Sequence, residues 1–195
     1  MPGELTPLSS SASYFDLFGV PVAVDEATLT RRFRELSRLY HPDRWANADP
    51  ETQTIALDAS ALLNDAYRTL RDPFRRAEYL LRRESGVSLN DLQKTAKAPQ
   101  ELFARVLELQ EALMEYQEAR LDDDAATLLR LRPELDVGRA EFSQAYDRLS
   151  DQLQGVFEHY DGATDRAAAL ETLAGIVGTR GYLRRVLTNL DGTLV

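Results

Sequence analysis

The chain has no cysteine and only two histidines. The lack of cysteine excludes disulfides, thiolate zinc sites, cysteine nucleophiles and cysteine-held iron–sulfur clusters. With so few histidines, a histidine-rich metal site is excluded as well. We therefore expect neither a bound metal nor a cofactor.

Long apolar runs are also missing. No stretch approaches the roughly 18 consecutive apolar residues of a membrane-spanning helix. Residues 1–13, MPGELTPLSSSAS, have neither the basic start nor the apolar block of a secretory signal, and they lack the arginines of a mitochondrial transit peptide. We expect a disordered tail over residues 1–13 and a cytoplasmic protein with no membrane partner.

The chain has fewer basic than acidic residues, with 23 Lys and Arg against 32 Asp and Glu, so its net charge is −9. This balance argues against nucleic acid as a partner. The deficit is uneven: residues 14–84 carry 11 Lys and Arg against 12 Asp and Glu, whereas residues 85–195 carry 12 against 19. The asymmetry indicates two functional halves.

Strand signals are scarce, and apolar residues instead recur at three- and four-residue steps. The sequence therefore predicts an all-α fold. Polar residues 85–98 form the expected linker, and the long helices after it predict an antiparallel three-helix bundle over residues 99–195. The expected helices cover residues 14–18, 26–40, 51–71, 73–84, 99–120, a short turn from 122, 133–160 and 164–190.

Several helix ends carry recognisable capping residues. Ser13 is a candidate N-cap for the first helix and Gly19 ends it. Asp25 is a candidate N-cap for the second helix, and Pro42 ends that helix because proline disfavours helical geometry in the preceding residue. Asp72, followed by Pro73, provides a cap and a first-turn proline for the fourth helix.

The second helix has two distinct faces when its residues are placed at 100° intervals. One face is an apolar stripe that belongs to a core: Leu29, Phe33, Leu36 and Tyr40. The opposite face is basic and leads into the segment His41-Pro42-Asp43: Arg31, Arg34 and Arg38. These arginines form either an ordinary solvated face or a surface that steers an acidic partner.

His41 and Asp43 allow three interpretations: a catalytic dyad, a helix stop, or a contact surface for another protein. A dyad needs a nucleophile that the histidine activates. The chain has no cysteine, and no serine lies in a G-x-S-x-G motif. We therefore expect no catalytic residue, and we expect Trp45 to pack beneath the loop.

The basic helix that ends in His-Pro-Asp-Arg, followed by a loop and an apolar helix, resembles the J-domain of DnaJ-type co-chaperones. This resemblance implies that residues 14–84 form a J-domain. It also implies that the segment docks on the ATPase of a heat-shock 70 chaperone and stimulates ATP hydrolysis. The implied chaperone-binding residues are His41, Pro42, Asp43, Arg44, Arg31, Arg34 and Arg38.

Two further stretches, YFDLFGVP and NDAYRTLRDPFRRAEYLL, resemble the HscB family of J-type co-chaperones in iron–sulfur cluster assembly. The resemblance implies that the chain delivers the scaffold protein IscU to an HscA- or DnaK-type chaperone and is not an enzyme. Two alternatives stay open: a J-domain protein with a different client, or a helical adaptor in which the His-Pro-Asp segment is incidental.

The first helix of the expected bundle carries two apolar stripes, although one is enough to close a bundle. The first contains Leu102, Val106, Leu109, Leu113 and Tyr116. The second contains Phe103, Leu107 and Met114, with Glu108 and Glu111 beyond it. The second stripe indicates either a helix buried on two sides or an exposed apolar patch with an acidic rim, which is typical of protein-binding sites.

The HscB resemblance implies that this helix binds the scaffold. The family usually has a larger apolar residue where this chain has Ala104, and some members have a basic residue in place of Gln110. The implied scaffold-binding residues are Phe103, Ala104, Leu107, Glu108, Glu111 and Tyr182.

Overall fold

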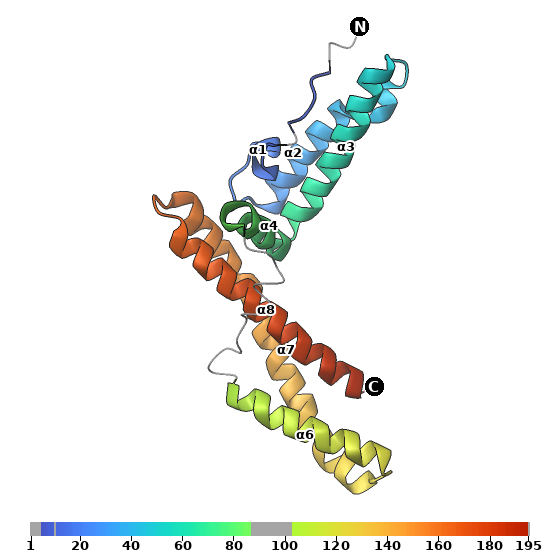
Figure 1. The fold of residues 1–195 in the computed structure, drawn as a ribbon, viewed down its shortest axis with the longest axis vertical. Helices are drawn as coiled ribbons and strands as arrows, with labels where there is room; N and C mark the ends of the chain where they lie inside the picture. Colours follow the sequence, from blue (N-terminus) through green and yellow to red (C-terminus); the bar gives the residue numbers. More distant parts are fainter. Residues whose placement is uncertain (1–4, 10, 87–102, 195) are drawn as a thin grey trace.

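The computed structural model describes residues 5–9, 11–86 and 103–194, without the side chain of Phe103. Within these ranges every regular element is a helix, which confirms the all-α prediction. The molecule is elongated: α1, α2 and α3 lie at one end, α6 lies at the other, and α4 lies between them (Figure 1).

The N-terminal half contains five helical elements, and their ends confirm the predicted capping residues. Ser13 and Asp16 form a capping box, Gly19 ends α1 with φ 59°, and Asp25 accepts from the amide of Thr28. The elements are α1 (Tyr14–Phe18), α2 (Glu26–Leu39), the 3₁₀ helix η1 (Pro42–Trp45), α3 (Pro50–Arg71) and α4 (Pro73–Ser85).

The core of this half forms where α3 packs against α1, α2 and η1. The apolar stripe of α2 faces this core: Leu29 and Tyr40 are buried, while Phe33 and Leu36 are partly buried and pack against it. In α3 the buried line is Ala56, Ala59, Leu63, Ala66 and Leu70. Ile55 and Leu62 of the same helix are only half-buried.

The segment expected as a disordered tail differs in the structure. Leu5 is buried in the core, and the Tyr40 hydroxyl donates to the carbonyl of Thr6 at 3.0 Å. Burying the leucine and satisfying the hydroxyl both favour an ordered segment over residues 5–9.

The C-terminal half contains α6 (Phe103–Leu121), α7 (Ala125–Gly162) and α8 (Ala167–Leu194). The predicted short turn and separate helix from 133 are wrong, because α7 runs unbroken through Pro133. An interior proline costs about 3 kcal/mol. Leu131 and Leu135, on either side of it, are buried in the core, so tertiary packing outweighs that cost. The expected linker beyond Gly86 and the helix start at 99 lie outside the described residues.

Helix α4 joins the two halves, because it packs against both α7 and α8. Its Arg76 is buried and donates hydrogen bonds to three carbonyls, those of Leu70, Val22 and Val24, at 2.8, 3.0 and 3.0 Å. The same guanidinium lies 5.1 Å from the ring centroid of Phe157 on α7. One side chain of α4 therefore links the N-terminal loop to the C-terminal bundle.

Two further contacts close this junction. The Asp161 carboxylate accepts from the amides of Val22 and Ala23 at 3.1 and 2.8 Å. Arg180 of α8 lies 3.9 Å over the ring of Phe74 on α4. Contacts from both α7 and α8 thus hold the N-terminal half in one orientation.

Replacing Arg76 tests this junction. Arg76→Leu leaves three buried carbonyls without their donor, so we expect a loss of about 3 kcal/mol or more in the free energy of unfolding. Urea unfolding measures it. Arg75→Leu, the exposed neighbour on α4, is the control and should change stability by about 0.5 kcal/mol at most. Equal effects of the two variants would contradict the role of Arg76.

Gly138 tests the close approach of α6 and α7. A Cβ atom at this position would clash with the Leu109 side chain, which is buried and has little room to move. We expect Gly138→Ala to lower stability by about 1–3 kcal/mol through overpacking. Gly155 of the same helix has open space around it, so Gly155→Ala should be neutral or stabilising. Thermal unfolding of both variants checks the contrast.

Candidate interaction surfaces

The basic face of α2 is exposed, and its charges are uncompensated. The only acid between Thr28 and Tyr40 is Glu35, which pairs with Arg32 at 2.8 Å. Arg32 also donates to the carbonyl of Phe18, so it belongs to the fold and not to the basic face. The single acid of this stretch is thus held by a fourth arginine.

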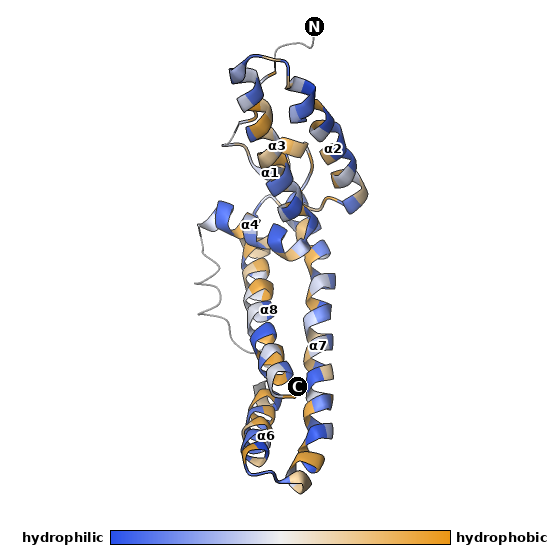
Figure 2. Cartoon of the chain, turned by 90° about the vertical axis from the view of Figure 1, so that its right-hand side faces the viewer, coloured by the Kyte–Doolittle hydropathy of each residue, from blue (hydrophilic) through white to orange (hydrophobic). Residues whose placement is uncertain are grey.

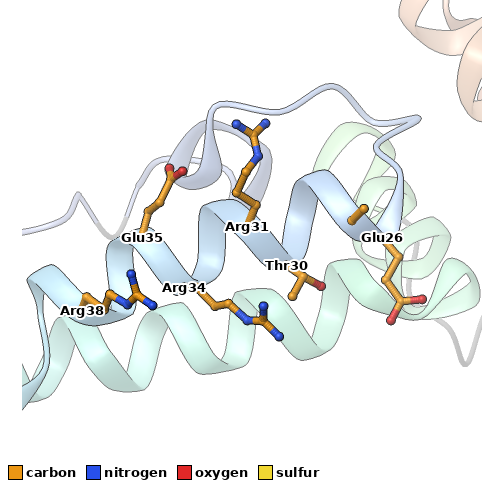
Figure 3. Close-up of a pocket in the computed structure, with 7 residues that line it drawn as sticks. Glu26, Thr30, Arg31, Arg34, Glu35 and Arg38 are labelled. Atoms are coloured by element: carbon orange, nitrogen blue, oxygen red, sulfur yellow. The ribbon is translucent and has the colours of Figure 1, made fainter.

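Arg31, Arg34 and Arg38 remain exposed along α2 and form no ion pair with any described side chain. Figure 3 shows them along the helix, with Glu35 beside them. Hydrophilic residues cover the outer side of α2 in Figure 2. The three guanidinium groups are therefore accessible to solvent.

The loop after α2 places His41 and Asp43 in solvent. His41 is the N-cap of η1, and its Nδ1 accepts from the amide of Asp43 at 3.3 Å. The His41 and Asp43 side chains are 58% and 91% exposed, and Nδ1 lies 3.7 Å from the nearer carboxylate oxygen. That separation is too long for a hydrogen bond, so the dyad geometry is not formed.

Trp45 packs into the core under the His41-Pro42-Asp43 loop, which confirms the packing predicted for this side chain. Its ring is buried, and its Nε1 donates to the carbonyl of Leu39 at 2.9 Å. Exposed Arg44 lies 6.0 Å from the ring centroid. Pro42, as the first residue of η1, sets the backbone between His41 and Asp43.

Helix α6 buries its first apolar stripe and exposes part of the second. Val106, Leu109, Leu113 and Tyr116 are buried, as predicted, whereas Leu107 and Met114 are 47% and 64% exposed. Burial on two sides is therefore wrong for Leu107 and Met114. Leu102 and the side chain of Phe103 lie outside the described residues, so their roles stay predictions.

The acidic rim lies next to this patch. Ala104, Glu108 and Glu111 are exposed. Glu108 pairs with Arg105 at 3.0 Å, and Arg105 also pairs with Glu141 on α7 at 2.9 Å. The hydrogen bond that Arg105 donates to Glu141, more than the one that it donates to Glu108, raises the pKa of Arg105. Glu111 is the rim carboxylate without an ion pair among the described residues.

Tyr182 joins the patch from α8. It lines a groove between α6 and α8 together with Gln110 and Leu113. Helical geometry places Gln110 next to Met114 and Leu107 around α6, so Tyr182 lies at the edge of the patch. Met114 was absent from the predicted site, although its spacing of seven residues from Leu107 indicates a shared face.

The described residues offer no site for a resident metal ion, since no group of three or more His, Asp or Glu side chains lies close enough to hold one. None of the helices in this part of the chain is long and apolar enough to cross a membrane. The two candidate surfaces lie far apart: the α2 face with its loop at one end of the molecule, and the α6 patch at the other (Figure 1).

Comparison with known proteins identifies the family of the chain. Residues 13–79 match the DnaJ domain model. A Vibrio cholerae co-chaperone protein HscB homolog is 42% identical over 103 residues, covering 52% of this chain and 59% of that protein. The Bordetella petrii homolog is 38% identical over 141 residues, covering 71% of this chain and 79% of that protein.

The match to the Vibrio cholerae relative thus spans less than two thirds of that protein's length. The solved structure of chaperone HscB from Vibrio cholerae extends the likeness: its TM-score is 0.62 at 28% identity, covering 94% of this chain and 100% of that one. The DnaJ match includes the helices on either side of the exposed His41-Pro42-Asp43 loop. The chain belongs to the HscB family of J-domain co-chaperones.

Proposed function

We propose that this protein is a co-chaperone that docks on the ATPase of a heat-shock 70 chaperone and stimulates its hydrolysis of ATP. The observation that carries the proposal is the α2 surface: Arg31, Arg34 and Arg38 lack partners among the described residues and lead into the exposed His41-Pro42-Asp43 loop. Family membership supports the same activity.

The surface suits an acidic partner for physical reasons. Three arginines on one helix steer an acidic surface toward the loop, and this attraction weakens with salt. Arg44 adds a fourth positive charge beside the loop. The exposed Asp43 carboxylate can accept a charge-assisted hydrogen bond from a partner arginine. In this proposal the chain itself performs no catalysis, because the chemistry occurs in the partner.

Replacing the loop histidine tests the docking. His41→Gln should reduce ATPase stimulation to the rate of the chaperone alone, because the exposed ring is lost from the contact while the fold is kept. Steady-state ATP hydrolysis measures it. His159→Gln removes the other exposed histidine and should leave stimulation unchanged. Normal stimulation by the His41 variant would sink the proposal.

We also propose that the α6 patch binds the iron–sulfur scaffold protein IscU and brings it to the chaperone. The exposed Leu107 and Met114 side chains offer apolar anchors, and Glu108 and Glu111 provide the acidic rim. Tyr182 extends the patch from α8. An apolar centre with a charged rim is the usual anatomy of a protein-binding surface.

Truncating the anchors tests scaffold binding. Phe103→Ala combined with Leu107→Ala should weaken IscU affinity by about tenfold or more, because buried anchors typically contribute more than about 1 kcal/mol each. Isothermal titration calorimetry measures the affinity. Val137→Ala, at an exposed apolar position on α7, is the control and should leave it unchanged. An unaltered titration with the double variant would count against the patch.

A different client is the alternative for the α6 patch. In that case the chain would stimulate the ATPase but would not retain IscU in a pull-down. The cytoplasmic location expected from the sequence stays a prediction.

A further inference from the structure

Helix α8 carries a local excess of positive charge that neither proposed surface uses. Between Thr172 and Leu190 it contains three arginines and no acid, within the half of the chain that is otherwise acidic. Arg180, Arg184 and Arg185 are spaced so that all three border one side of the helix.

These arginines line a groove of about 590 Å³ between α4 and α8. Arg180 is fixed within it: the guanidinium lies over Phe74, donates to the Tyr146 hydroxyl at 3.0 Å and lies 3.7 Å from Glu78. Burial raises the pKa of Glu78, and the nearby Arg180 opposes this shift. Two charged side chains that contact each other, Arg180 and Glu78, thus form part of the groove wall.

Arg184 and Arg185 are the surplus charges. Both side chains are exposed, and neither forms an ion pair with a described residue. Thr188 and Asn189 line the same groove and supply neutral hydrogen-bonding groups. Because Glu78 offsets only one of the three arginines, the groove retains a net positive charge.

The groove continues into an apolar one. Arg185 and Asn189 also line the space of about 340 Å³ between α6 and α8, which contains Tyr182. Its remaining walls are mostly aliphatic: Val106, Leu109, Leu113, Val186 and Leu190. A basic end and an apolar end therefore adjoin along α8.

We propose that this α8 groove binds an extended acidic segment of a partner protein, with its carboxylates at Arg184 and Arg185 and an apolar side chain beside Tyr182. Arg180 to Asn189 span about 14 Å of helix. An extended peptide covers that length with about four residues. The basic end lies outside both proposed surfaces, whereas the apolar end shares Tyr182 with the α6 patch.

A peptide suits this groove better than a nucleic acid does. The apolar end can bury aliphatic side chains, which a phosphate backbone lacks. The net charge of −9 also repels a long polyanion, whereas a short segment meets mainly the local arginines.

Fluorescence anisotropy with labelled octapeptides tests the proposal. One peptide has three consecutive acidic residues followed by two leucines, a second has the reverse order, and the control peptides carry Asn and Gln in place of Asp and Glu. We expect an acidic peptide to bind and its amide counterpart to bind at least about tenfold more weakly, with an affinity that falls as salt rises.

The variant Arg184→Gln with Arg185→Gln should weaken binding of the acidic peptide by about tenfold or more, because it removes both surplus charges. Arg68→Gln with Arg148→Gln removes two exposed arginines elsewhere and should leave the affinity within about twofold. Equal binding of acidic and amide peptides, equal effects of the two double variants, or no binding at all would overturn the proposal.

The same samples distinguish two other possible occupants of the α8 groove: a segment of this chain and a nucleic acid. If the Arg184 and Arg185 variant shifts the backbone amide resonances of residues 87–102 without added peptide, the chain itself fills the groove and the proposal fails. Tighter binding of a single-stranded oligonucleotide with the charge of the acidic peptide would overturn it in favour of nucleic acid.

Discussion

The buried guanidinium of Arg76 is the interaction on which the arrangement of this molecule depends. It donates to three carbonyls of the N-terminal half and lies against Phe157 of the bundle. Burial lowers the pKa of Arg76, while the charges of Asp161 and Asp72 act against that shift. A buried cation is tolerated only when its donors are satisfied, and here two of the three acceptors, the carbonyls of Val22 and Val24, belong to the loop that meets α7. Folding of the J-domain and docking of the bundle are therefore coupled through one side chain.

This coupling gives the two proposed surfaces a fixed relation. The α2 face with the His41 loop lies at one end of the molecule, and the α6 patch lies at the other. Helix α4 lies between these two ends (Figure 1). Asp161 on α7 and Arg180 on α8 support the same junction. In the proposed function the protein positions a client relative to the chaperone. ATP hydrolysis would then take place in the chaperone. The basic end of the α8 groove lies beside α4, and its apolar end reaches Tyr182 of the α6 patch.

Local signals were sufficient to predict most helix ends and the exposed faces. Ser13, Gly19, Asp25 and Asp72 act within a few residues of themselves, so their effects can be read without knowledge of the tertiary structure. Pro133 misled the prediction because its cost is local, whereas the compensation from Leu131 and Leu135 comes from packing against other helices. Leu5 was missed for a similar reason, since its burial depends on distant core residues. The arginines of α8 were visible in the sequence, but the groove exists only because α4 and α6 lie beside them.

The most direct test of the account is the steady-state ATPase rate of a heat-shock 70 chaperone measured in four mixtures: alone, with this protein, with IscU, and with both. A rigid co-chaperone that binds the scaffold at one end and the chaperone at the other should give a rate with both that exceeds the sum of the two separate stimulations. A rate with both that is no higher than the rate with this protein alone would contradict it.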